Sequence, residues 1–188
     1  MRDVEFLFDY ASPYSYLANE ALDRVLPGVR VTYQPVYLRG FETFAKGVPF
    51  SPAKLMWTVK DLRRAAEELG VKLGMPPTFP VNGLYGLRAA LAARRAGLLE
   101  RFHTPMFRAV WRDGRESSTK DGLLAILADL GLSELGSAVD DPAIKDELKT
   151  ATEAAAKRGA FGVPTFFVGD ELFWGHDRMH QVAKAAHE

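Results

Sequence analysis

The chain has 188 residues, with 24 lysines and arginines, 24 aspartates and glutamates, and no cysteine. A net charge of zero lacks the positive field that binding to nucleic acid or to an anionic membrane requires. Without cysteine the chain can form no disulfide, zinc–thiolate site or iron–sulfur cluster, and it supplies no thiol nucleophile. No stretch approaches the roughly 18 consecutive apolar residues of a membrane span. We therefore expect one cytoplasmic unit that binds neither nucleic acid nor membrane.

The beginning of the chain has the pattern strand, helix, strand. Residues 4–9 form a short apolar and aromatic run that ends at a turn, which is typical of a buried strand. Apolar residues then recur every three or four positions over 14–25 and predict an amphipathic helix, with Ser12 as its N-cap and Pro13 at its first position. Residues 29–36 predict a second strand that a proline stops.

The middle of the chain is helical almost throughout. Four apolar stripes with spacings of three and four predict helices around residues 55–69, 84–91, 99–110 and 123–130. Pro105 falls inside the third stripe and predicts a kink or a boundary there. We therefore expect residues 41–139 to form a helical insertion subdomain, while 1–40 and 140–188 form the core.

The last part of the chain returns to mixed structure. Residues 144–158 predict a polar, alanine-rich helix, and an apolar strand follows at 166–168. Gly169-Asp170 predicts a tight hairpin to a strand at 171–174, and Asp177 is expected to cap a final helix. The order β-α-β, helical insert, α-β-β-α places the chain in the α/β class.

Ser12 is the first candidate for chemistry. A helix N-terminus presents free N–H groups and about half a positive charge, so it stabilises an anion such as a thiolate. The simpler interpretation is that Ser12 only caps the helix, and the pattern alone favours that interpretation.

Pro164, in the run Gly-Val-Pro-Thr-Phe at 162–166, is the second candidate. Only about 5–6 % of X-Pro bonds in folded proteins are cis, so the spacing alone predicts a trans proline that opens a strand.

Four stretches resemble one known family. They are DYASPYSYLA at 9–18, FPVN at 79–82, FRAVW at 107–111, and GVPTF at 162–166 together with FWGHDR at 173–178. In order and spacing they resemble 2-hydroxychromene-2-carboxylate isomerases and kappa-class glutathione transferases, which belong to the DsbA-like branch of the thioredoxin superfamily. The resemblance implies a thioredoxin-like core with a large all-helical insertion. Redox members of that branch carry Cys-X-X-Cys where this sequence has serine at 12 and 15, so disulfide chemistry of that kind is excluded.

The resemblance implies glutathione as the cofactor. Ser12 would donate a hydrogen bond to the glutathione sulfur and hold it as a thiolate. Val163, before what the family would make a cis Pro164, would pair its backbone with the cysteinyl part of the tripeptide. A free thiol with a pKa of about 8.5 is only about 3 % ionised at pH 7, and lowering that pKa by about two units makes it about three-quarters ionised.

The resemblance also assigns the two ends of glutathione. The turn that holds His176, Asp177 and Arg178 would receive the γ-glutamyl end. Lys54 would pair with a glutathione carboxylate, or it is a solvated lysine at a helix start. Two positions depart from the family: Val48 stands where an Asn is usual, which removes one polar contact to glutathione, and His176 replaces a small polar residue.

Phe79, Asn82, Tyr85 and Trp111 are candidates for an aromatic-substrate pocket between insertion and core, although aromatic residues at helical spacing are more often core. A metal site is not expected, because His176 and His180 are spaced as two ligands but no third accompanies them.

The function that the resemblance implies is a cytoplasmic, glutathione-dependent isomerase of aromatic-compound catabolism. The thiolate would add reversibly to an unsaturated carbon of a 2-hydroxychromene-2-carboxylate or its ring-opened form, so the substrate is a small aromatic or unsaturated carboxylate. The alternatives are a kappa-class-like glutathione transferase or peroxidase, and a non-catalytic DsbA-like binding protein, which Val48 favours. Family members are often dimers, so a homodimer is a further expectation, although no exposed stripe argues for it independently.

Overall fold

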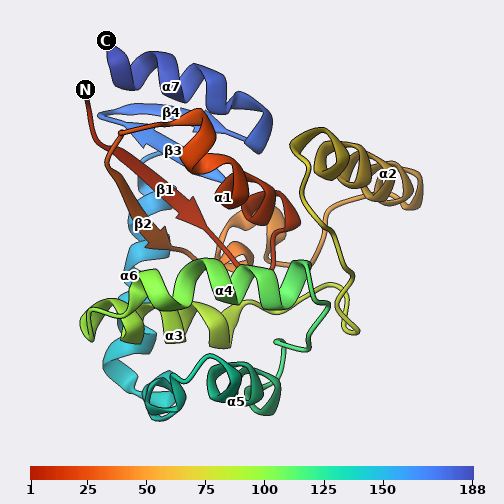
Figure 1. Ribbon diagram of the computed structural model, residues 1–188, viewed down its shortest axis with the longest axis vertical. Helices are drawn as coiled ribbons and strands as arrows, with labels where there is room; N and C mark the ends of the chain where they lie inside the picture. The colour runs from red at the N-terminus through yellow and green to blue at the C-terminus, as the bar shows by residue number, and fades with distance from the viewer.

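The strand β1 (Val4–Phe8) lies inside a four-stranded sheet with the order β2-β1-β3-β4. It pairs in parallel with β2 (Val31–Pro35) and antiparallel with β3 (Thr165–Val168), and β3 pairs antiparallel with β4 (Glu171–Trp174). The computed structural model describes all residues 1–188 and shows this sheet with helices packed around it (Figure 1). The two ends of the chain therefore build one mixed sheet, and the predicted α/β, thioredoxin-like fold is confirmed.

The side chains of β1 alternate between two hydrophobic clusters, as the pleat of a strand requires. Phe6 and Phe8 belong to a cluster of 39 buried residues that contains side chains of α1, α3, α4 and α7. Leu7 points the other way and joins a cluster of 7 buried residues, which includes Phe167 of β3 and Ala155 of α6. The sheet is therefore covered on both faces, and its larger core continues without a break into the helices of the middle segment.

The helices agree well with the predicted pattern. The α-helices are α1 (Pro13–Val25), α2 (Pro52–Leu69), α3 (Leu84–Arg95), α4 (Leu99–Trp111), α5 (Lys120–Asp129), α6 (Pro142–Lys157) and α7 (Met179–His187). The short 3-10 helices are η1 (Leu38–Gly40), η2 (Glu42–Phe44), η3 (Ser133–Asp140) and η4 (His176–Arg178). None of the helices combines the length and the apolar composition needed to cross a bilayer.

At two places the structure differs from the local predictions. Of the kink or boundary predicted at Pro105, the boundary is absent, because α4 continues through that residue. The buried face of α4, which includes Phe102 and Met106, offsets the loss of one backbone hydrogen bond. Asp177 does not cap the last helix: η4 intervenes, α7 begins at Met179, and the Asp177 carboxylate accepts a hydrogen bond from the Arg178 guanidinium at 2.5 Å.

Candidate active site at the start of helix α1

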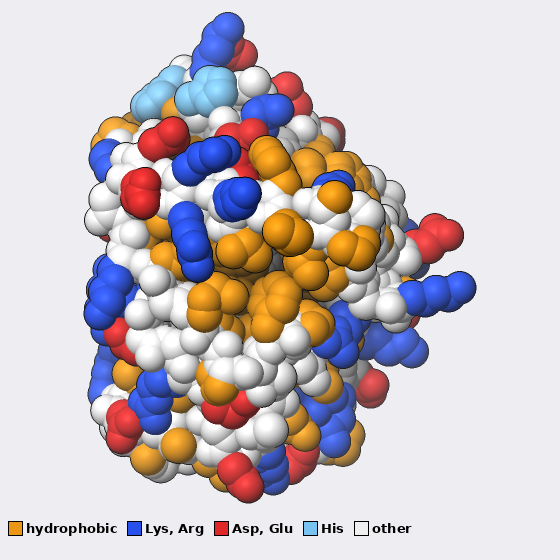
Figure 2. All heavy atoms as spheres, turned by 90° about the vertical axis from the view of Figure 1, so that its right-hand side faces the viewer, with side chains coloured by type: hydrophobic (Ala, Val, Ile, Leu, Met, Phe, Trp, Pro, Cys, Tyr) orange, Lys and Arg blue, Asp and Glu red, His pale blue; other side chains and the backbone are white.

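A cavity of about 190 Å³ opens where α1 begins, and segments far apart in the sequence line it. On the face of the molecule that carries α2, hydrophobic side chains gather around a hollow (Figure 2). The lining is mainly apolar and contains one acidic side chain, Asp9, and one basic side chain, Arg39. Its aromatic members are Tyr14, Tyr37, Phe44, Phe50, Phe79 and Trp174.

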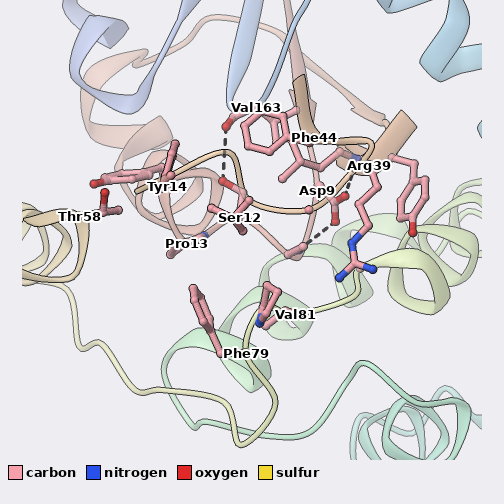
Figure 3. A pocket seen from close by; sticks show the side chains of 18 of the residues that line it. Asp9, Ser12, Pro13, Tyr14, Arg39, Phe44, Thr58, Phe79, Val81 and Val163 are labelled. Atoms are coloured by element: carbon pink, nitrogen blue, oxygen red, sulfur yellow. Dashed lines mark hydrogen bonds between the residues drawn. The ribbon is translucent and has the colours of Figure 1, made fainter. Parts of the chain in front are cut away.

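Ser12 is the N-cap of α1, as predicted. Its extended backbone lets Oγ accept a hydrogen bond from the Ser15 N–H at 3.1 Å, and Pro13 takes the first helical position. The hydroxyl in turn donates to the carbonyl oxygen of Val163 at 3.4 Å, which Figure 3 shows as a dashed line across the cavity. Because that bond is long, the hydroxyl proton is easily redirected to a ligand at the helix start.

The Val163–Pro164 peptide bond is cis, so the trans bond expected from spacing is wrong and the cis bond implied by the resemblance is confirmed. The trans preference of an X-Pro bond is only about 0.5–1 kcal/mol, so tertiary contacts decide it. Here the Pro164 carbonyl accepts from the Gly175 N–H at 2.9 Å, which fastens the segment to the end of β4. The Val163 N–H has no acceptor within the protein.

Asp9, which the sequence analysis did not single out, is fully buried at the inner end of the cavity. Its two oxygens accept hydrogen bonds from the N–H groups of Ala11 at 2.9 Å and Leu38 at 2.8 Å. Burial raises the pKa of the Asp9 carboxyl to about 6, although these bonds and the nearby Arg39 act in the opposite direction. The signal available in the sequence was an acidic residue directly after an apolar strand.

Tyr14 connects the cavity to the turn after β4. Its ring stacks on the ring of His176 with 4.9 Å between centroids, and its hydroxyl donates to Asp61 of α2 at 2.8 Å. Burial and the contact with Asp61 raise the pKa of the Tyr14 hydroxyl, and burial lowers the pKa of His176. His176, Asp177 and Arg178 do not line the cavity themselves, and the last two form an exposed ion pair beside it.

Lys54 lies on the first turn of α2, and its ammonium group sits 4.4 Å from the centre of the Phe50 ring. Phe50 and Leu55 line the cavity while Lys54 is exposed, so the lysine lies at the rim. Val48 also lines the cavity and is 39 % exposed, so the position where an Asn was expected presents an apolar side chain.

Of the four predicted pocket residues, only Phe79 lines the cavity. Trp111 is fully buried in the core, where its indole N–H donates to the Tyr10 carbonyl at 2.8 Å. The Asn82 side chain accepts from the Leu84 N–H at 3.2 Å and so stabilises the start of α3. Tyr85 is half-buried and outside the lining. The structure therefore does not bring these last three residues to the cavity.

The loop that carries Phe79 contains a second cis bond, Phe79–Pro80, which no feature of the sequence signalled. The segment between α4 and α5 holds this loop in place: Glu116 accepts a hydrogen bond from the Thr78 hydroxyl, and the Ser118 hydroxyl accepts one from the Asn82 N–H at 3.0 Å. The outer wall of the cavity is therefore fixed by contacts within the helical segment.

Comparisons with known proteins point to one family. The family described as "DSBA-like thioredoxin domain" matches residues 3–187. A 2-hydroxychromene-2-carboxylate isomerase of Sphingobium xenophagum is 30 % identical over 95 % of this chain and 94 % of its own length. Human glutathione S-transferase kappa 1 is 26 % identical over 97 % of this chain and 89 % of its own length. A solved 2-hydroxychromene-2-carboxylate isomerase structure superposes with a TM-score of 0.83 at 29 % identity, covering 97 % of this chain and 93 % of the other.

Proposed function

Since this chain belongs to the DSBA-like thioredoxin-domain family, with 2-hydroxychromene-2-carboxylate isomerases and kappa-class glutathione transferases among its relatives, we propose that it is a glutathione-dependent isomerase acting on substrates of the 2-hydroxychromene-2-carboxylate type. One observation carries the proposal. At the start of α1, where a thiol would be expected in a redox enzyme of this fold, the chain offers the Ser12 hydroxyl beside the backbone of Val163 and contains no sulfur nucleophile of its own.

The residues at this site fit a peptide-like thiol. The Val163 N–H lacks an acceptor in the protein, and its carbonyl holds only the long bond from Ser12, so this backbone can pair with an extended ligand. The Ser12 hydroxyl and the start of α1 would hold the sulfur. Lys54, at the rim, would pair with a carboxylate of glutathione. The turn that holds His176, Asp177 and Arg178 would receive its γ-glutamyl end.

Glutathione, when bound, supplies a thiolate that adds reversibly to an unsaturated carbon and lets a bond rotate before elimination. The task of the chain is to keep that sulfur ionised and to orient it. The Ser12 hydroxyl hydrogen bond and the partial positive charge of the α1 N-terminus both favour the charged form of the sulfur. The mainly apolar lining lowers the polarity around the sulfur position and so strengthens these interactions. Such a cofactor is kept as the thiol in a reducing compartment such as the cytoplasm.

Calorimetric titration with glutathione and a spectrophotometric assay of 2-hydroxychromene-2-carboxylate isomerisation test the proposal. We expect heat of binding, and turnover only when glutathione is present. Ser12→Ala should lower turnover at least about tenfold while the protein stays folded, because a hydrogen bond to a charged sulfur is lost. The absence of binding at millimolar glutathione, or turnover without glutathione, would overturn the proposal.

A kappa-like transferase is the second candidate, and the apolar cavity beside the same sulfur position supports it. An aryl halide electrophile, offered together with glutathione, separates the two activities. Faster conjugation of the halide than isomerisation of the chromene would favour the transferase.

A further inference from the structure

Arg39 is the one basic side chain that lines the cavity, and it is the feature that the proposed function leaves unexplained. Arg94 pairs with Glu147 at 2.7 Å, and Arg108 pairs with Glu20 at 2.7 Å. Arg39 is exposed, as is Arg101, and it forms neither an ion pair nor a side-chain hydrogen bond, although the buried Asp9 lies near enough to feel its charge. Figure 3 shows the guanidinium extending from η1 past Asp9 toward Val81.

The backbone that carries Arg39 is held firmly. Both residues directly before Arg39 are anchored: the Leu38 N–H donates to Asp9 at 2.8 Å, and the Tyr37 N–H donates to the buried Thr152 hydroxyl at 2.9 Å. Gly40 packs so closely on Thr152 that a Cβ there would lie 2.7 Å from its methyl carbon. The root of Arg39 is therefore fixed, and only its own side chain needs to order when a ligand binds.

The surroundings of Arg39 specify the ligand. Apart from Asp9, whose two oxygens accept hydrogen bonds from the N–H groups of Ala11 and Leu38, the cavity wall between Arg39 and Ser12 is apolar. Val81 and Phe79 lie on one side of it and Phe44 on the other, so it suits a flat hydrocarbon or aromatic group. A free guanidinium at the end of such a cavity matches a carboxylate, which it can bind through two parallel hydrogen bonds.

We propose that Arg39 binds the carboxylate of the second substrate, a flat unsaturated acid whose hydrocarbon part extends from η1 toward Ser12. Arg39 and Tyr14 lie on opposite sides of Ser12 (Figure 3). The Tyr14 side, which leads to His176, is left for glutathione. This division of the cavity rests on the proposed function, whereas carboxylate binding by Arg39 does not. Arg39 is thus a specificity-determining residue for acids over their neutral analogues.

The test uses trans-cinnamate and its neutral analogue trans-cinnamamide as probes. Binding is measured by calorimetry and by quenching of tryptophan fluorescence, because Trp174 lines the cavity. Wild-type protein should bind cinnamate at least about tenfold more tightly than cinnamamide. Arg39→Gln should abolish that preference by weakening cinnamate binding about tenfold, with cinnamamide binding and glutathione binding unchanged. The matched control Arg101→Gln removes an exposed arginine of α4 and should behave as wild type.

Two results would overturn the proposal. One is a wild-type protein that does not discriminate between the two probes. The other is an Arg39→Gln variant that keeps its affinity for cinnamate but loses glutathione affinity, since Arg39 would then belong to the glutathione site. Thermal unfolding of each variant establishes that it is folded. A protein that prefers cinnamate through Arg39 but binds no glutathione would refute the proposed function and leave the carboxylate site standing.

Discussion

The Asp9 carboxylate occupies the space that a side chain on Gly83 would need. A Cβ on Gly83 would overlap Oδ1 of Asp9 and would lie 3.1 Å from the Ala11 nitrogen. The backbone of Gly83 has φ −75°, which any residue adopts, so the close approach and not the conformation demands glycine here. This contact joins the end of β1 to the start of α3, and both residues line the cavity.

We therefore expect Gly83→Ala to destabilise the fold by about 1–3 kcal/mol, because the added methyl group must displace a buried carboxylate or the backbone. Denaturant unfolding measures the change. In an Asp9→Ala background most of this cost should disappear, since the carboxylate oxygen that the added methyl group would strike is gone. An equal cost in both backgrounds would show that the contact with Asp9 is not the cause.

Asp9 should also make stability depend on pH. Its pKa is raised from 3.8 to about 6 in the folded protein, so between these values the folded state binds more protons than the unfolded state. The contribution of Asp9 to stability is then fully present below about pH 4 and declines as the pH rises through about 6. The lost contribution is on the order of 3 kcal/mol.

Unfolding experiments at a series of pH values measure this contribution as the difference between wild type and Asp9→Asn. The substituted asparagine carries no ionisable group, so the disadvantage of the variant relative to wild type should shrink between about pH 4 and pH 6. A difference that stays constant with pH would show that the Asp9 carboxyl titrates normally.

Ser12→Asp separates the capping role of this residue from its proposed role toward sulfur. Aspartate caps a helix about as well as serine, but its carboxylate cannot donate to the Val163 carbonyl, so the loss in free energy of unfolding should be comparable with the ~1 kcal/mol of Ser12→Ala. Its negative charge, however, should raise the pKa of a thiol bound at the start of α1. Titration of the ultraviolet absorbance of the thiolate measures that pKa. If Ser12→Asp kept the turnover of the wild type, the role of Ser12 would be limited to capping α1.

The pair between Arg108 and Glu20 should matter more than the other surface ion pairs. The guanidinium makes two hydrogen bonds to one carboxylate, at 2.7 and 3.0 Å, and the Glu20 side chain is only 13 % exposed. Arg108→Gln should lower the free energy of unfolding by about 1–2 kcal/mol, because it leaves a largely buried carboxylate without its partner. Lys149→Gln, which removes an exposed pair with Glu153 at 3.9 Å, should change it by less than about 0.5 kcal/mol.

The strands and helices were predictable because their signals are local. The apolar run of β1, the stripes of α2 to α5 and the Ser12 cap all follow from short-range pattern and packing. Three features depend on contacts between distant segments and could not be predicted from spacing. The Val163–Pro164 bond follows tertiary contacts, Asp9 is buried only because Leu38 and Gly83 pack on it, and Trp111 lies in the core because Tyr10 offers its indole an acceptor.

The same limit applies to the cavity. The resemblance directed attention to Ser12 and Val163, which the structure places 3.4 Å apart, oxygen to oxygen, across 151 positions of the chain. It did not indicate Arg39, Tyr37 or Phe44, because their places in the lining follow from the path of the chain after β2.

The pair of serines at the start of α1 also determines how the site responds to oxidative stress. S-glutathionylation and disulfide formation both require a protein thiol, and the chain contains none. With Ser12 as the N-cap and Ser15 buried on the first turn, the start of α1 cannot form a mixed disulfide. Under the proposed function, oxidation would therefore act on the activity through the supply of reduced glutathione, and recovery would be as fast as that supply returns.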